Sequence, residues 1–282
     1  MTNIATGHTI LDCGGRPLVL DRPRIMGILN VTPDSFSDGG DWLSPRQAIL
    51  HAHHMATAGA DIIDIGGEST RPGADEVSVQ QELDRVIPVI EALWTETRIP
   101  ISIDTSKPEV MRAAASAGAG MINDVFALQG EGALQTAASL GLPVCLMHMQ
   151  GDPRSMQHQP FYNDVVGEVE TFLLARAQAC EKSGIPAGKI LIDPGFGFGK
   201  SLQHNLDLLA GLERLSSGAY PLLVGLSRKS MLAAITGREV DKRLAGSLAL
   251  AMLAVQAGAR VLRVHDVAET RDVVKVIQEV CA

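Results

Sequence analysis

The sequence lacks the usual features of secreted and membrane proteins. Its cysteines, Cys13, Cys145, Cys180 and Cys281, lie far apart and form no CxxC pair. This spacing indicates reduced, mostly buried thiols in a cytoplasmic protein. The N-terminus MTNIATGHTI has neither a basic start nor an apolar core, so we expect no signal peptide. No apolar run approaches the roughly 18–20 residues of a membrane span, and we predict a soluble protein that binds no membrane.

Several kinds of chemistry also lack support in the sequence. The formal net charge is −8, which argues against a nucleic-acid or anionic-membrane surface but not against a local anion site. There is no HExxH motif, no Cys/His cluster and no serine–histidine pair at a telling spacing, so zinc and nucleophilic mechanisms are not indicated. His51 and His54 could share a helix face, but no third ligand lies nearby, and a solvated helix face is the better interpretation.

The chain does contain a glycine-rich stretch around which the rest is organised. From Lys189 it is KILIDPGFGFGKS, a short apolar run that ends in Asp193 and leads into glycines at 195, 197 and 199. Glycine has no Cβ, so such a turn lets the main chain approach a ligand closely. A nucleotide-binding P-loop is not indicated, because three residues separate Gly195 from Gly199 where that motif needs four. Taken alone, Asp193 could also be a turn or helix-capping residue.

The same order of strand, polar residue, loop and helix recurs along the chain. Eight apolar runs have the length of buried strands, at residues 24–29, 61–65, 99–103, 121–125, 142–147, 190–193, 221–226 and 260–264. Their alternation with helices predicts parallel strands joined by right-handed crossovers. We expect an α/β fold, a (β/α)8 TIM barrel that forms one domain over residues 1–282. Within it we predict a hairpin at about 8–21 and the barrel at 24–282, with an open doubly wound sheet as the alternative.

Some helices have sharper local signals. Long helices are expected at 165–182 and 267–280. The apolar stripe within 83–94 indicates a helix whose striped face lies in the core. Ser106 and Glu109 have the spacing of a capping box at the start of another helix.

Polar residues stand where the predicted strands end, and in a barrel these ends share one mouth, where active sites lie. They are Asn30, Asp64 or its loop, Asp104, Asn123, Asp193, Lys229, Arg263 and His265. The carboxylates and amides suit a flat heterocycle with several N–H groups, and the cations suit an anion, so we predict a ring compound that carries a phosphate or diphosphate. Because burying both Asn123 and Asp124 is costly, one of them should face a ligand. His148 is better explained as a packed residue, and a Schiff base at Lys229 is a further alternative.

Eight segments resemble dihydropteroate synthases, a pterin-binding barrel family of folate biosynthesis. They are GILNVTPDSFSDGG at 27–40, DIGGESTRPGA at 64–74, SIDTSKPEV at 102–110, IND at 122–124, PVCLMHMQG at 143–151, LIDPGFGFGK at 191–200, LLVGLSRKSM at 222–231 and RVHDV at 263–267. They occur in order, one per strand end, and span most of the chain. The resemblance implies an enzyme, a transferase that condenses 6-hydroxymethyl-7,8-dihydropterin diphosphate with p-aminobenzoate to 7,8-dihydropteroate and diphosphate. It also implies Mg²⁺ as cofactor and a sulfonamide target.

The resemblance implies a role for each matching residue. The pterin would be held by Asp104, Asn123, Asp193 and Lys229, the diphosphate by Thr70, Arg71, Arg263 and His265, the p-aminobenzoate by Phe36, Pro72, Ser230 and Lys229, and Mg²⁺ by Asn30. The residues expected to be catalytic are Lys229, Asp104, Arg71 and Arg263. Departure of diphosphate would leave a ring-stabilised cation that the arylamine attacks, with no covalent enzyme intermediate.

The resemblance also bears on the surroundings of the site. The loops 30–43 and 66–77 would close over the substrates and exclude water. We expect Arg71 in one loop to pair with Asp38 in the other on closure. A homodimer through helices far from the mouth is implied as well.

Two other functions fit part of the pattern. A methyltetrahydrofolate-binding methyltransferase barrel handles a similar pterin, but it would not need the SRKS and STRP segments together. A non-catalytic pterin-binding protein would keep Asp104, Asn123 and Asp193 but would have no use for Arg71, Arg263 and His265. Tight pterin binding without turnover would favour that second alternative.

Overall fold

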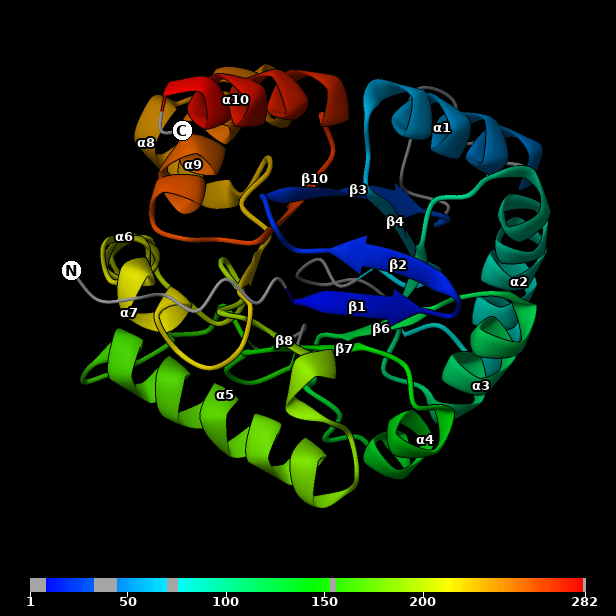
Figure 1. Ribbon diagram of the computed structural model, residues 1–282. Coiled ribbons are helices and arrows are strands. Elements are labelled where there is room, and N and C mark those ends of the chain that lie inside the picture. The colour runs from blue at the N-terminus through cyan, green and yellow to red at the C-terminus, as the bar shows by residue number, and fades with distance from the viewer. Residues whose placement is uncertain (1–8, 33–44, 70–75, 153–155, 281–282) are drawn as a thin grey trace.

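Eight parallel strands form a closed barrel inside a ring of helices (Figure 1). The computed structural model describes residues 9–32, 45–69, 76–152 and 156–280. The barrel strands are β3 (Arg24–Asn30), β4 (Ile62–Gly66), β5 (Ile101–Asp104), β6 (Met121–Asp124), β7 (Val144–Met147), β8 (Ile190–Asp193), β9 (Leu223–Val224) and β10 (Val261–Val264). The sheet order is β8-β7-β6-β5-β4-β3-β10-β9, and a parallel bridge between Ile192 and Leu222 joins its edges. The predicted (β/α)8 barrel is confirmed, and the open sheet is wrong.

The outer ring is made of helices that follow the strands in turn (Figure 1). They are α1 (Pro45–Ala58), α2 (Val79–Glu96), α3 (Pro108–Ala117), α4 (Ala133–Leu140), α5 (Val165–Lys182), α6 (Leu202–Ala210), α7 (Leu212–Ser216), α8 (Ser230–Thr236), α9 (Leu244–Gln256) and α10 (Val267–Val280), with 3-10 turns η2 (Ala187–Lys189) and η3 (Val240–Lys242). The helices predicted at 165–182 and 267–280 coincide with α5 and α10. Strand β9 is shorter than the predicted 221–226, because its ladder pairs only Leu223 and Val224 with β10.

An antiparallel hairpin, β1 (Ile10–Cys13) and β2 (Arg16–Val19), crosses the amino-terminal end of the barrel, as predicted (Figure 1). Gly14 and Gly15 have φ values of +65° and +84°, which a tight hairpin turn of this kind requires. The hairpin and the first residues of the barrel strands form one buried cluster: Leu11, Cys13, Leu18, Leu20, Met26, Ile62, Met121, Cys145, Leu191, Leu223 and Val261. The hairpin therefore closes the floor and leaves the opposite end of the barrel as the mouth.

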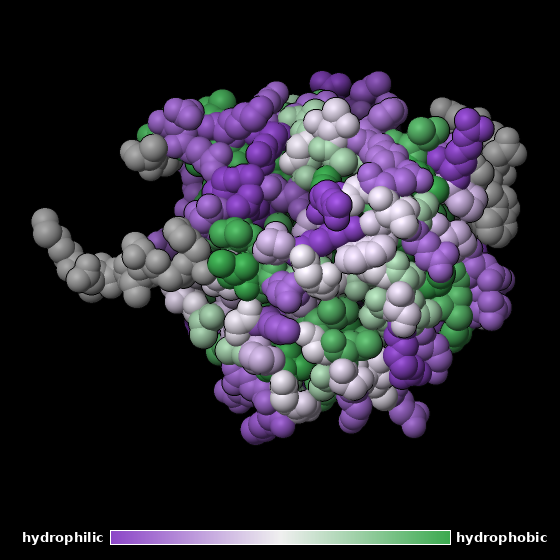
Figure 2. Space-filling view, turned by 45° about the vertical axis from the view of Figure 1, so that its right-hand side comes forward, coloured by the Kyte–Doolittle hydropathy of each residue, from purple (hydrophilic) through white to green (hydrophobic). Residues whose placement is uncertain are grey.

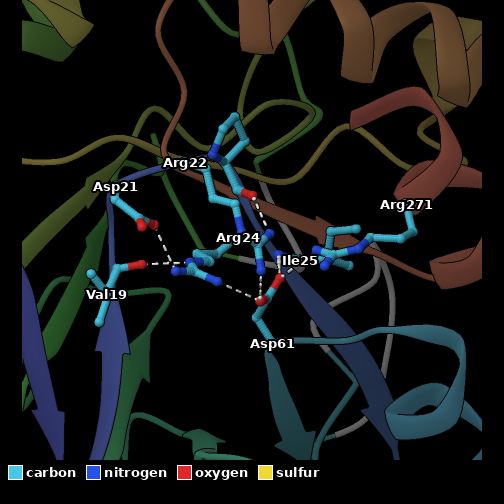
Figure 3. A network of polar contacts seen from close by, with 8 residues as sticks. Val19, Asp21, Arg22, Arg24, Ile25, Asp61 and Arg271 are labelled. Atoms are coloured by element: carbon cyan, nitrogen blue, oxygen red, sulfur yellow. Dashed lines mark hydrogen bonds and ion pairs between the residues drawn. The ribbon is translucent and has the colours of Figure 1, made fainter. Parts of the chain in front are cut away.

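A polar network also holds the floor together (Figure 3). The Asp61 carboxylate accepts hydrogen bonds from Arg22 and Arg24, each at 2.9 Å, and from Arg271 of α10 at 3.3 Å. It also accepts the Ile25 N–H of β3 at 2.9 Å. Since Asp61 directly precedes β4, the network joins two strands and the last helix at the end opposite the mouth. We assign it to stability.

The start of α3 differs from the prediction. The helix begins at Pro108 with Lys107 as its N-cap, and no side chain caps it, so the predicted capping box at Ser106 is wrong. Proline suits the first helical position because it lacks the N–H that a cap would satisfy. The Lys107 ammonium instead binds the carboxylates of Glu68 at 2.5 Å and Glu82 at 2.6 Å.

The apolar stripe of α2 is core except at its end. Val86, Ile90 and Leu93 are buried, as predicted. Trp94 is 37% exposed. The Arg16 guanidinium lies over the Trp94 ring, 3.7 Å from the ring centroid. The prediction that Trp94 lies in the core is therefore wrong, because the ring covers a cation of the floor hairpin instead.

The visible surface mixes polar and apolar residues (Figure 2). None of the helices in the described ranges combines the length and hydropathy that a membrane crossing requires. Helix α9 stands out by composition, since LAGSLALAMLAVQ contains no charged residue. Its exposed side includes Leu244, Met252 and Leu253.

Candidate active site

The carboxyl ends of β3 to β6 bring polar residues into one row across the mouth. Sheet register pairs Asn30 with Gly66, Gly66 with Asp104, and Asp104 with Asn123. Gly66 lies between Asn30 and Asp104, and a Cβ there would be in ordinary contact with both, 3.6 Å from Asn30 Oδ1 and from Asp104 Cβ. The residues that the sequence predicted at separate strand ends therefore lie side by side.

Arg263 of β10 is the centre of an ion-paired cluster. Its Nε donates to Asp64 Oδ2 and a terminal nitrogen donates to Asp104 Oδ2, both at 2.7 Å. The Arg263 side chain is 20% exposed, whereas that of Asp64 is fully buried. Burial alone would lower the pKa of Arg263, but the charges of Asp64 and Asp104 outweigh it and raise that pKa. The guanidinium thus fixes two carboxylates from neighbouring strands.

Asn123 joins the cluster through Asp64. Its Nδ2 donates at 3.0 Å to Asp64 Oδ2, the same oxygen that accepts from Arg263. With its nitrogen engaged in this way, Asn123 presents its oxygen as an acceptor. The other Asp64 oxygen, Oδ1, is buried and has no hydrogen-bond partner among the described residues. Such a buried acceptor is costly, so Asp64 is held there by the two bonds that it does make.

Asp124 turns away from the mouth. Its carboxylate accepts the N–H groups of Phe126 at 2.8 Å and Leu128 at 2.9 Å. These bonds stabilise a turn in which Ala127 and Leu128 have φ values of +52° and +58°. Of the two adjacent polar residues in β6, Asn123 is therefore the one that belongs to the site.

Burial shapes the ionisation of the carboxylates at the mouth. It raises the pKa of Asp104 to about 7, against the attraction of Arg263, and the charge of Asp64 raises it further. It also raises the pKa of Asp193, although the Gly195 N–H donates to Asp193 Oδ1 at 2.7 Å and opposes the shift. Carboxylates that burial has withdrawn from water are candidates to pair with ligand donors.

Asp193 leads into a glycine turn, residues 194–199, that faces Lys229. The three glycines of this turn have φ values of +66°, +82° and +61°. The Phe198 ring lies against the Lys229 ammonium, with Nζ 4.1 Å from the ring centroid. Burial lowers the pKa of Lys229 to about 8, and the charge of Asp193 opposes that shift. Lys229 is therefore mostly protonated at neutral pH and able to donate hydrogen bonds.

His265 follows Arg263 by two residues. Its backbone N–H donates to Ser227 Oγ at 3.3 Å, and its ring Nδ1 lies 3.0 Å from the same oxygen. Burial lowers the pKa of His265 to about 3, and the charges of Arg228 and Arg263 add to the shift. The imidazole is thus neutral at physiological pH and serves as a hydrogen-bonding group, not as a cation.

The turn before Lys229 has an unusual backbone. Arg228 has a φ of +57°, and its N–H donates to Ser247 Oγ of α9 at 3.0 Å. Its guanidinium pairs with Asp266, with Nε at 3.1 Å from Oδ2. A left-handed residue that is not glycine persists only where its surroundings hold it, as these contacts do. The turn sets the direction of Lys229 and leaves Ser230, the first residue of α8, exposed.

Sequence reasoning left Asp64 undecided and missed two further residues that the structure brings to the site. For Asp64, a carboxylate in an apolar strand was the signal. Phe198 and Lys200 lie in the glycine turn and just after it, and only their tertiary contacts reveal them. His148 is packed as predicted, because its ring meets Phe172 edge-on at 5.0 Å and its Nδ1 lies 2.9 Å from Lys200 Nζ.

Asn30 is the residue predicted to bind Mg²⁺. Its Oδ1 lies at the end of β3, across Gly66 from the Asp104 carboxylate. No group of three or more His, Cys, Asp or Glu residues in the described ranges is arranged to hold a metal. A single protein oxygen, that of Asn30, is compatible with Mg²⁺. This ion commonly takes one or two protein oxygens and completes its shell with water and substrate phosphates.

Five residues named in the sequence predictions lie outside the described residues. They are Phe36, Asp38, Thr70, Arg71 and Pro72. Their roles, and the expected pairing of Arg71 with Asp38, stay predictions.

The barrel mouth therefore brings carboxylate and amide acceptors together with a lysine, an arginine and a neutral histidine. The sequence matches the model of the family described as pterin binding enzyme over residues 26–265. It is 54% identical over 264 residues to the dihydropteroate synthase of Escherichia coli strain K12, covering 94% of each chain.

Solved structures agree with this match. The chain resembles the Xanthomonas albilineans dihydropteroate synthase with 4-aminobenzoic acid at 57% identity and a TM-score of 0.93, covering 98% of this chain and 99% of that one. A dihydropteroate synthase of the same organism in complex with 7,8-dihydropteroate has 54% identity and a TM-score of 0.89, covering 97% and 99%.

Proposed function

The chain belongs to the pterin-binding enzyme family, and we infer from this membership that it catalyses the dihydropteroate synthase reaction. It condenses 6-hydroxymethyl-7,8-dihydropterin diphosphate with p-aminobenzoate and releases 7,8-dihydropteroate and diphosphate. Within the chain, the observation that carries this conclusion is the cluster in which Arg263 orders Asp64, Asp104 and, through Asp64, Asn123. A pterin edge bears several N–H groups, and this cluster presents acceptors in fixed positions.

We assign the pterin to Asp104, Asn123, Asp193 and Lys229. Asp104 and Asp193 would accept N–H groups of the ring, and Lys229 would donate to its acceptor atoms. Burial raises the pKa of both carboxyl groups, so a donor-bearing ring that pairs with them relieves part of that cost. This assignment explains why Lys229 is placed beside Asp193 and over Phe198.

We assign the diphosphate to Arg263 and His265, with Thr70 and Arg71. The guanidinium of Arg263 would stabilise the charge that develops on the leaving group, while the neutral imidazole of His265 would donate a hydrogen bond. Asn30 would hold Mg²⁺ with the diphosphate; when bound, this ion would neutralise phosphate charge.

We assign the p-aminobenzoate to Phe36, Pro72, Ser230 and Lys229. The exposure of Ser230 supports the assignment of Ser230 and Lys229, because Ser230 directly follows Lys229 at the rim of the mouth. The amine of p-aminobenzoate would attack the pterin methylene after diphosphate departs. The chain's residues would bind and orient both substrates, and no covalent bond to the enzyme is needed.

We further propose a homodimer in the cytoplasm. A helix that is apolar on all sides is normally covered, and the outer side of α9 exposes Leu244, Met252 and Leu253. A second copy of this chain is the occupant that the family resemblance implies. Sedimentation equilibrium tests this: the parent should be dimeric, Met252→Glu should be monomeric, and a monomeric parent would refute the proposal.

The experiment that tests the function is product formation. Purified protein is mixed with dihydropterin diphosphate, p-aminobenzoate and Mg²⁺, and dihydropteroate is measured by chromatography. A sulfonamide should compete with p-aminobenzoate. Borohydride should trap no adduct at Lys229; a trapped adduct would instead support a Schiff-base enzyme. Pterin binding with no product would support the carrier or methyltransferase alternatives.

A further inference from the structure

Lys200 is a buried lysine whose hydrogen bonds all go to neutral groups. It is 3% exposed, at the end of the glycine turn. Its Nζ donates to the carbonyl oxygens of Gly195 at 2.9 Å and Phe198 at 3.0 Å and lies 2.9 Å from His148 Nδ1. Burying an ammonium that has no carboxylate as a hydrogen-bond partner is costly. We therefore expect Lys200 to have a role that offsets this cost.

The hydrogen bonds of Lys200 connect two parts of the glycine turn, residues 194–199, to each other and to the neighbouring strand. Two of its acceptors are carbonyl groups of that same turn, three residues apart. The third, His148, lies at the end of β7, and a Cβ at Gly195 would lie 1.9 Å from the His148 carbonyl oxygen. The ammonium therefore holds the turn against the neighbouring strand end, where no side chain at residue 195 would fit.

The same turn carries two groups of the proposed site. At its start, the Gly195 N–H fixes the Asp193 carboxylate at 2.7 Å. Near its end, the Phe198 ring lies against the Lys229 ammonium. Lys200 binds the carbonyl groups of these two turn residues, Gly195 and Phe198. Gly195 therefore links it to Asp193, and Phe198 links it to Lys229.

The protonation of the pair supports this arrangement. Burial lowers the pKa of His148 to about 3, and the charge of Lys200 adds to the shift, so the imidazole is neutral and Nδ1 can accept. Burial lowers the pKa of Lys200 to about 7, while Asp193 opposes that shift. Both forms are therefore populated near pH 7, and the ammonium, with three N–H donors, is the form that can serve all three acceptors.

We propose that Lys200 is a positioning residue for the synthase reaction, because its ammonium holds the glycine turn in the shape that aims Asp193 and Phe198 at the substrates. The proposal rests on the proposed function and adds to it a residue that touches neither substrate. A lysine that served stability alone would not need to order both ends of this turn.

The test replaces the ammonium and then restores it. Lys200→Ala removes three methylene groups and the ammonium, which n-propylammonium matches in size and donors. We expect kcat/KM for p-aminobenzoate to fall by about 100-fold, as for a site displaced by about 1 Å. Propylammonium should restore at least part of it, whereas tetramethylammonium, which has no N–H group, should not.

Two further variants keep the test decisive. Lys189→Ala is the matched control, because that half-buried lysine also donates to a backbone carbonyl, Gly141, at 2.6 Å but lies outside the site. The activity of this variant should be unchanged. If Lys200→Ala does not fold, Lys200→Gln, which keeps neutral N–H donors, takes its place with an expected fall of about 10-fold. Values of kcat and KM within twofold of the parent in the folded variant would overturn the proposal, as would an activity loss that only follows the unfolded fraction.

The design separates this proposal from the proposed function. A parent protein without turnover would refute the function, whatever the variants do. Pterin affinity, measured by titration calorimetry, would then still test Lys200. Weaker pterin binding in the folded Lys200→Gln variant would support its effect on Asp193, and equal binding would refute it.

Discussion

Replacing Asp64 with asparagine perturbs the centre of the site without changing its size. In the parent, Asp64 Oδ2 accepts from Arg263 at 2.7 Å and from Asn123 at 3.0 Å, while Oδ1 is buried without a partner in the described part of the chain. In Asp64→Asn, the amide oxygen can replace Oδ2. Its NH₂ group must then occupy the place of Oδ1, where it is an unsatisfied donor.

The expected loss follows from these contacts. The amide nitrogen replaces an oxygen that already lacks a partner, so this exchange contributes little. The loss comes from converting the charge-assisted bond with Arg263 into a bond to a neutral acceptor, which costs about 1–3 kcal/mol. Arg263 keeps Asp104 and is 20% exposed, which limits this contribution. We therefore expect a loss of about 2 kcal/mol in the free energy of unfolding, or roughly 4–8 °C in Tm. Since Asn123 loses its charged partner, pterin affinity should fall about 10-fold.

Calorimetric unfolding and pterin titration measure both effects. The matched control is Ser102→Ala, because Ser102 pairs with Asp64 in the sheet and its buried Oγ also has no partner among the described residues. Removing that hydroxyl should leave stability equal or slightly higher. A Tm for Asp64→Asn within 1 °C of the parent would refute the reasoning, since the carboxylate would then contribute nothing to the cluster.

The other predictions concern Lys229 and Asn30. Because burial lowers the pKa of Lys229 to about 8, the cost of burying its charge is complete below pH 8 and disappears as the pH rises toward 10.5. Lys229→Met should therefore raise Tm at pH 7 while turnover falls about 100-fold or more, and a lowered Tm would contradict this. In the parent, pterin affinity should decline as the pH rises through 8, which titration calorimetry would measure; a constant affinity from pH 7 to 9 would exclude the Lys229 ammonium as the donor. Chelation of Mg²⁺ should stop turnover reversibly, and Asn30→Ala should raise the Mg²⁺ concentration needed for half-maximal rate about 10-fold; an unchanged requirement would exclude Asn30 as ligand.

The sequence predicted the barrel well because apolar runs and helical stripes are local signals. Once the strands are known to be parallel, their carboxyl ends lie at one end of the barrel. The polar residues that follow the strands could therefore be placed at one mouth. Asn123 and Asp124 illustrate the limit: both are buried polar residues of one strand, and only the turn at 126–128 shows which of them leaves the site.

Contacts between distant segments explain the remaining differences. Ser106 has the spacing of a cap, but Pro108 opens the helix and Lys107 binds carboxylates of α2 and the loop before it. Lys200 forms its bonds inside a turn whose shape the sequence does not specify, and Asp64 depends on Arg263, which lies 199 residues away. None of these partners can be chosen from local periodicity.

The most direct test of the central claim is diphosphate release from dihydropterin diphosphate and Mg²⁺, measured with and without p-aminobenzoate. The account predicts release that depends on p-aminobenzoate, yields dihydropteroate in equal amount and is lost in Lys229→Ala. Pterin binding with no diphosphate release under either condition would contradict it.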